Sequence, residues 1–142
     1  MSNNALSNKS CWIGWLAVLV VMQAYGYLIH EVGLSDTYQS LASVFRPEAE
    51  MMDMMWMMMV GSAFTLAVFC YIFTYGHQGK GIMEGVRYGF WMGLFLAIPS
   101  SVDAYVVYPL TGELAVIWFV TGVVGMMIAG AVFAAIYKPS SA

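Results

Sequence analysis

Long apolar stretches, separated by short polar segments, dominate the hydropathy pattern of the chain. The stretches cover residues 12–29, 54–75, 88–108 and 114–137. Each is close to the roughly 20 residues that a helix needs to cross the ~30 Å hydrocarbon core of a bilayer. Lipid offers no hydrogen bonds to backbone N–H and C=O groups, so a helix, which pairs these groups internally, is the expected form. The pattern predicts transmembrane helices over approximately residues 12–29, 48–75, 82–108 and 114–137.

The segment between the first two predicted crossings has a pattern of its own. Its apolar residues recur at spacings of three and four, which is typical of a helix with one apolar face; they are Tyr38, Leu41, Ala42 and Phe45. We expect this face to lie either on the membrane or on the helix bundle. The sequence therefore predicts an all-α membrane protein. Its single membrane domain, residues 1–142, forms a four-transmembrane-helix bundle with a short amphipathic outer helix.

The composition supports a membrane protein and argues against other classes. Hydrophobic residues make up 61% of the chain and charged residues only 9%, whereas about 25% of a typical soluble domain is charged. A soluble domain of this length has too little interior to hide so much apolar surface from water. The net charge of -3, without a basic stripe in the sequence, excludes nucleic acid as an expected partner.

The distribution of basic residues predicts the orientation in the membrane. With four crossings, the basic residues on one side are Lys9, Lys80, Arg87 and Lys138, and Arg46 alone falls on the other. Loops rich in Lys and Arg remain in the cytoplasm. We therefore expect a multi-pass protein of the bacterial inner (cytoplasmic) membrane with both termini in the cytoplasm.

Small residues recur every fourth position along the third predicted crossing. Gly81, Gly85, Gly89 and Gly93 form this stripe on one helix face. Small side chains let helices approach closely in lipid, where association depends on van der Waals contact. The stripe predicts a close helix contact, with packing inside one bundle favoured over a contact between subunits.

A dense methionine run opens the second predicted crossing. Seven of the nine residues from position 51 to 59 are methionine. Met51, Met55 and Met58 share one helix face, and thioethers suit Cu(I). The alternative is that these flexible side chains fill space at the outer mouth of the bundle. Cu(I) is thus a possible cofactor, with His30 as a further ligand if its imidazole is neutral.

Polar residues gather at the depth of the outer membrane boundary. His30 and Glu31 end the first crossing, Asp53 starts the second, and Asp103 lies near the outer end of the third. Carboxylates within a membrane are costly and usually face the bundle interior or a wet cavity. Two interpretations of Asp103 stay open: a ligand-lining group next to the expected distortion at Pro99, or a carboxylate close enough to the surface to be hydrated.

Three segments resemble a group of small uncharacterised bacterial membrane proteins of about this length. They are residues 45–51 (FRPEAEM), residues 79–89 (GKGIMEGVRYG) and the pair Trp118-Phe119. The resemblance covers most of the chain from the first helix to the last. It implies a four-helix protein of the bacterial inner membrane and carries over no established activity and no functional residue.

The sequence favours a non-catalytic protein. His30 and His77 fall at opposite membrane faces in this topology, and no nucleophile, base and orienting group meet at one depth. The preferred hypothesis is an accessory or interaction subunit of a larger membrane complex, with other membrane subunits or self-association as partners beside the lipid bilayer. The alternative is a small oligomeric transporter or metal-handling protein with a Cu(I) or cation site at the outer face.

Overall fold

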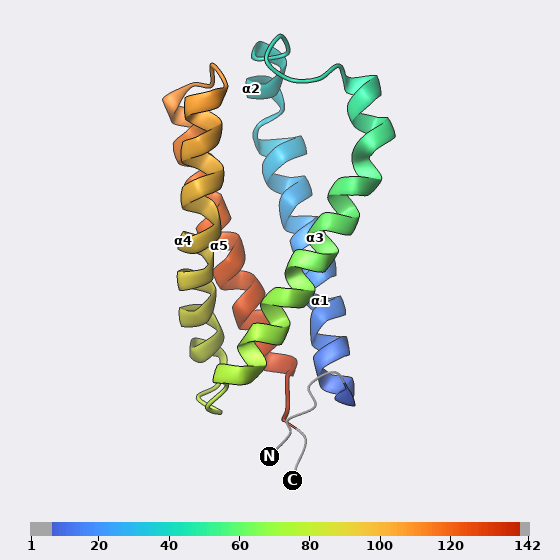
Figure 1. The fold of residues 1–142 in the computed structure, drawn as a ribbon, viewed down its shortest axis with the longest axis vertical. Helices are drawn as coiled ribbons and strands as arrows, with labels where there is room; N and C mark the ends of the chain where they lie inside the picture. The colour runs from blue at the N-terminus through green and yellow to red at the C-terminus, as the bar shows by residue number, and fades with distance from the viewer. Residues whose placement is uncertain (1–6, 140–142) are drawn as a thin grey trace.

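A computed structural model describes residues 7–139 of the chain, and all regular structure in this range is helical (Figure 1). The elements are α1 (Lys9–Tyr27), η2 (Leu28–Gly33), α2 (Ser35–Ser40), α3 (Glu48–Gly76), α4 (Ile82–Val107) and α5 (Gly112–Ile136). η2 is a π-helix that continues α1.

Four helical segments are long and apolar enough to cross a membrane, as the sequence predicts. They are Lys9–Gly33, Glu48–Gly76, Ile82–Val107 and Gly112–Ile136. The first is longer than the predicted range 12–29 because it begins at the Asn8 cap and its π-helical end extends to Gly33. Most of its surface, like that of the other three, is not buried within the chain, which is the expected state of helices solvated by lipid.

The two described chain ends lie at the same end of the bundle (Figure 1). Hydrogen bonds join them: the Asn8 side-chain amide donates to the Lys138 carbonyl oxygen at 2.7 Å, and the Ser10 hydroxyl donates to the same oxygen at 2.8 Å. We call this the terminal end, and the opposite end, which carries α2 and the α4–α5 connection, the α2 end. The bonds fix the start of α1 against the end of α5.

Charge separates strongly between the two ends. Seven of the eight acidic residues lie at the α2 end: Glu31, Asp36, Glu48, Glu50, Asp53, Asp103 and Glu113. Four of the five basic residues lie at the terminal end: Lys9, Lys80, Arg87 and Lys138. The remaining base, Arg46, forms an exposed ion pair with Glu50 at 3.8 Å.

Glycines bring α4 and α5 into backbone contact. A Cβ atom added at Gly85 would meet the Gly130 carbonyl oxygen at 2.0 Å, and one added at Gly89 would meet the Met126 carbonyl oxygen at 2.1 Å. At Gly93 the nearest atom, Val123 Cα, would be 2.9 Å away. Only hydrogen fits at such separations, so these three residues bring the two backbones together.

Gly81 has a different role from the one that the four-residue spacing suggests. An added Cβ there meets nothing within 4 Å, and the residue has a φ of +75° just before the first residue of α4. Glycine adopts this left-handed backbone conformation without steric cost. Gly81 therefore belongs to the turn that starts α4 and lies outside the α4–α5 contact.

The main core is in the half of the bundle nearest the terminal end. Phe69, Phe73 and Phe133 are almost fully buried there, with Val18 and Cys70. Polar atoms of aromatic side chains are paired across this core, because Trp15 Nε1 donates to the Ala63 carbonyl at 3.0 Å and the Tyr88 hydroxyl to the Phe69 carbonyl at 2.6 Å. These contacts hold the second half of α3 in the bundle.

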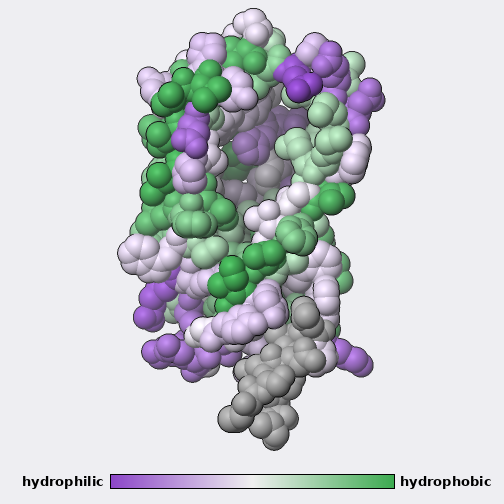
Figure 2. Space-filling view, in the orientation of Figure 1, coloured by the Kyte–Doolittle hydropathy of each residue, from purple (hydrophilic) through white to green (hydrophobic). Residues whose placement is uncertain are grey.

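The first half of α3 leans away from the other helices (Figure 1). Every residue from 48 to 61 is exposed, and the first buried residue of this helix is Leu66. Figure 2 shows the molecule hollowed between this part of α3 and the α4–α5 hairpin. We call residues 48–61 the free half of α3.

The predicted amphipathic outer helix exists but is short. α2 ends at Ser40, and the chain turns through residues 41–45. Three of the four residues of the predicted face, Tyr38, Leu41 and Phe45, pack against the bundle in a cluster around Leu34, Leu110 and Leu114, whereas Ala42 is exposed. Of the two expected surfaces for this face, the bundle is the observed one.

Candidate functional site

A cavity of about 410 Å³ lies between α1, η2, α4 and α5, toward the α2 end. Its lining is mostly apolar or small, with Met22, Ile29, Gly93 and Ala97 among the lining residues. Small-molecule sites in proteins are typically 300–1,000 Å³ and combine such walls with a few placed polar groups. None of the lining residues belongs to α3, and on the side of the free half of α3 the molecule is hollowed (Figure 2).

A chain of three hydrogen-bonding side chains lies at the α2 end of the cavity. Trp118 Nε1 donates to the Tyr38 hydroxyl oxygen at 2.9 Å, and that hydroxyl is 2.6 Å from His30 Nδ1. An indole N–H is only a donor. Tyr38 therefore accepts from Trp118, and its own hydrogen is paired only if it is donated to His30 Nδ1.

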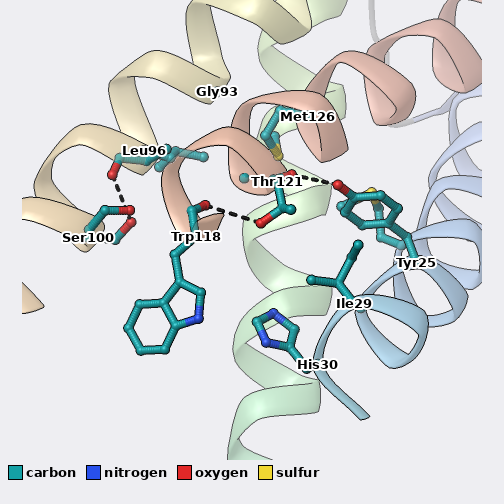
Figure 3. Close-up of a pocket in the computed structure, with 14 residues that line it drawn as sticks. Tyr25, Ile29, His30, Gly93, Leu96, Ser100, Trp118, Thr121 and Met126 are labelled. Carbon is teal, nitrogen blue, oxygen red and sulfur yellow. Dashed lines mark hydrogen bonds between the residues drawn. The ribbon is translucent and has the colours of Figure 1, made fainter. Parts of the chain in front are cut away.

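The Tyr38 hydrogen bond to Nδ1 determines whether His30 Nε2 carries a hydrogen. If Nδ1 of neutral His30 accepts from Tyr38, the ring hydrogen is on Nε2; in the charged form both nitrogens carry hydrogens. Nε2 is therefore a donor in both forms. Figure 3 shows the His30 ring projecting into the space between Ile29, Thr121 and Trp118.

Tyr38 keeps its proton at neutral pH. Burial raises the pKa of its hydroxyl above the ordinary value of 10.0, and the nearby Glu31 carboxylate raises the pKa further, while the Trp118 hydrogen bond acts in the opposite direction. Desolvation favours the neutral phenol. The Trp118–Tyr38–His30 chain is therefore intact as long as His30 is neutral.

The local backbone explains how His30 reaches this position. His30 lies in η2, the π-helical continuation of α1. A π-turn is wider than an α-turn, and π-turns inside helices occur frequently at functional sites. The ring is stacked on Tyr38 with a centroid distance of 6.0 Å, so α2 holds it from one side.

Hydroxyl groups on three helices line the rest of the cavity, and most of them are already paired. The Tyr25 hydroxyl donates to the Thr121 carbonyl at 2.8 Å, and the Thr121 hydroxyl donates to the Ile117 carbonyl at 2.6 Å. The Ser100 hydroxyl donates to the Ala97 carbonyl at 3.3 Å. Ser101 differs: its residue is 4% exposed, lines the cavity, and makes no hydrogen bond within residues 7–139.

Among the candidate ligands from the sequence, only His30 lines the cavity. Met51, Met55 and Met58 lie on the free half of α3 with exposed fractions of 40%, 37% and 70%. Cu(I) binding by these methionines therefore stays a prediction.

The carboxylates from the sequence analysis lie on the surface. Glu31, Asp53 and Asp103 are exposed, each on a different helical element. In the described part of the chain, no three His, Cys, Asp or Glu side chains are close enough to hold a metal ion.

Sequence reasoning missed most of the cavity's polar groups. Tyr38, Trp118 and Ser101 come from three separate elements, and no spacing along the chain connects them. In the sequence, Trp118 belongs to a resemblance only, and Ser101 lies two four-residue steps beyond Gly93. The one available signal is the polar pair Ser100-Ser101 beside Pro99.

A second polar cluster, at the terminal end, stabilises the α3–α4 turn. The Glu84 carboxylate accepts hydrogen bonds from the backbone N–H groups of Gln78 at 2.5 Å and Lys80 at 2.7 Å. His77 Nδ1 lies 3.4 Å from the same carboxylate, and its ring packs between Phe73 and Tyr137. These contacts close the turn, and we assign them a structural role.

Comparison of the chain with protein-family models, curated proteins and solved structures gives no match.

Proposed function

We propose that this protein is a non-catalytic subunit of a larger membrane complex, and that the free half of α3 is the surface on which a transmembrane helix of another subunit packs. The observation that supports this proposal is the asymmetry of α3. Residues 66–74 include five buried side chains, whereas residues 48–61 contact no other helix closely enough to bury any side chain.

The chemistry of the free half suits a helix partner. Methionine has three rotatable bonds and a polarizable sulfur, so a methionine-rich surface adapts to the shape of a partner. Met52, Met58 and Trp56 are at least 60% exposed. A second helix in the hollow of Figure 2 would cover these side chains and complete the bundle on that side.

Charge at the α2 end indicates what such a partner carries. Glu48, Glu50 and Asp53 are at the start of α3, where carboxylates also interact favourably with the helix dipole. Arg46 offsets only part of this charge. A partner helix with Lys or Arg at the same depth would be complementary, and complementary charge fixes the register of helices and selects partners.

We also propose an orientation of the protein in the membrane. The terminal end carries four bases and the α2 end carries one, which favours a cytoplasmic location for the terminal end. In a bacterial cell the protein would then lie in the inner membrane, with the free half of α3 in the outer leaflet.

Co-purification from the native membrane tests the proposal. Met55 and Met58 are changed together to Ala, which keeps α3 helical and removes two side chains from the proposed contact surface. The control is Phe95→Ala on α4, because Phe95 is 72% exposed and lies outside that surface. A stoichiometric partner retained by the wild type and by Phe95→Ala, and reduced in the double variant, supports the proposal. Equal recovery in all three proteins contradicts it.

A further inference from the structure

We propose that the cavity between α1, η2, α4 and α5 binds a neutral lipophilic molecule that carries a carbonyl group, with Ser101 and His30 as the hydrogen-bond donors available to it. This inference goes beyond the proposed subunit role, because no cavity-lining residue belongs to α3. A partner helix in the hollow would cover the cavity, so the test uses the isolated protein.

The position of the cavity selects a lipophilic ligand. Its walls belong to three segments that are long and apolar enough to cross a membrane, and on the side of the free half of α3 the molecule is hollowed (Figure 2). A molecule dissolved in the bilayer reaches the cavity from the side without crossing a water layer. A charged ligand would have to leave water to enter, which is costly without a paired opposite charge.

Two hydrogen-bond donors in the cavity favour a carbonyl as the polar group of the ligand. Ser101 is 4% exposed and lines the cavity, and its hydroxyl has no partner among the described residues, so its hydrogen is available to a molecule in the cavity. When His30 Nδ1 accepts from Tyr38, His30 Nε2 carries the second free hydrogen. Both groups are available as donors, and a carbonyl oxygen is an acceptor that needs no donor in return.

The remaining hydroxyl groups are consistent with an acceptor ligand. Tyr25, Ser100 and Thr121 already donate their hydrogens to backbone carbonyls, so none competes as a free donor. Gly93, Gly122 and Ala97 line the cavity with no side chain larger than a methyl group. The ligand's carbonyl group can belong either to a planar ring, as in a quinone, or to the ester of an acyl chain.

Native mass spectrometry of the purified full-length protein in detergent micelles tests this inference. Three probes are titrated: an alkyl-1,4-naphthoquinone, an alkyl ester of a fatty acid, and an alkylnaphthalene of the same size as the quinone but without oxygen. We expect saturable binding of one molecule per chain for at least one carbonyl probe. The alkylnaphthalene should bind at least about fivefold more weakly than the quinone if the ring carbonyl is the ligand group, since one hydrogen bond contributes about 1 kcal/mol.

Matched variants show whether the predicted donors are responsible. Ser101→Ala and His30→Phe each remove one donor and should weaken binding of the carbonyl probe about fivefold. Ser100→Ala is the control, because the Ser100 hydroxyl lines the same cavity but already donates to Ala97; its affinity should equal that of the wild type. The probe without oxygen needs no variant, so it tests the inference even if a variant fails to fold.

Two results would overturn the inference. One is the absence of saturable binding for both carbonyl probes. The other is binding of a carbonyl probe with the same affinity in the wild type, Ser101→Ala and His30→Phe. If the ester binds and the quinone does not, the ligand is an acyl lipid; if the quinone binds, it is a ring carbonyl compound. Both outcomes support the site.

Discussion

Adding one methyl group at Gly89 should force α4 and α5 apart. The Cβ atom of alanine would be 2.1 Å from the Met126 carbonyl oxygen and 2.7 Å from Met127 Cα. Real Cβ contacts essentially never fall below 3.0 Å, so the two backbones must separate by about 0.9 Å. Both obstructing atoms belong to the backbone, which cannot rotate away as a side chain does.

Two opposing contributions determine how much Gly89→Ala lowers the free energy of unfolding. Overpacking a close contact typically costs about 1–3 kcal/mol, and we expect the upper part of this range because a gap of 0.5–1 Å forfeits a quarter to a half of each van der Waals contact. Replacing glycine by alanine inside a helix returns up to about 1 kcal/mol. The net expectation for Gly89→Ala is a loss of about 1–2 kcal/mol.

Gly61→Ala is the matched control. Gly61 lies inside α3, and an added Cβ there meets nothing within 4 Å. The same chemical change should leave stability unchanged or raise it by up to about 1 kcal/mol. The assay is unfolding of each purified protein by sodium dodecyl sulfate in mixed micelles, followed by circular dichroism. A stability of Gly89→Ala within about 0.5 kcal/mol of Gly61→Ala would refute the close α4–α5 contact.

Three further predictions concern orientation, metal and the hydrogen-bonded chain. A reporter that is active only in the cytoplasm should work when fused after Lys138 and fail within residues 34–46; activity of the second fusion would invert the proposed orientation. If the methionine run binds Cu(I), changing the three candidate methionine ligands together to Leu should weaken Cu(I) binding under reducing conditions against a competing chelator, and unchanged or undetectable binding would assign the run to packing. Tyr38→Phe should destabilise the protein by about 1–2 kcal/mol, because Trp118 loses its acceptor. Since the folded-state pKa of Tyr38 is raised above 10.0, the contribution of its hydroxyl should be constant between neutral pH and pH 10.0 and disappear as the pH rises through the raised value. A loss of that contribution between neutral pH and pH 10.0 would contradict the assignment of Tyr38 as the donor.

The sequence predicts the membrane-spanning helices correctly because a chain segment in lipid has few alternatives to a helix. A run of about 20 apolar residues must pair its own backbone groups, and the four observed segments follow the four runs. The every-fourth spacing also placed Gly85, Gly89 and Gly93 on one face. It did not distinguish Gly81, whose positive φ depends on the turn before α4.

The hydropathy pattern does not predict which part of α3 packs against the other helices. The residues from Met51 to Met59 are apolar on nearly every face, so they do not indicate which side contacts a neighbour. The exposure of this half depends on the packing of its other half around Phe69 and Phe73. The cavity also depends on tertiary packing, so the sequence points to the methionines as a binding site and not to the cavity.

The polar groups of the cavity depend on tertiary structure in a similar way. His30 was identified as a polar residue at the end of the first helix, but its partners Tyr38 and Trp118 lie 8 and 88 positions further along the chain. Only the π-helical end of α1 and the packing of α2 on the bundle bring them together. Ser101 has no unusual sequence context apart from Pro99, and its unpaired hydroxyl is apparent only from its burial.

Site-specific photo-crosslinking in the native membrane tests the proposed subunit role most directly. A photoreactive amino acid replaces Met55 or Met58 on the free half of α3, or Phe95 on α4 as the lipid-exposed control, and the products are separated by mass after irradiation. The account predicts a defined protein adduct from both α3 positions, of one partner mass, and none from position 95. Lipid adducts alone at all three positions, or an adduct of twice the mass of this chain, would contradict a contact with another subunit.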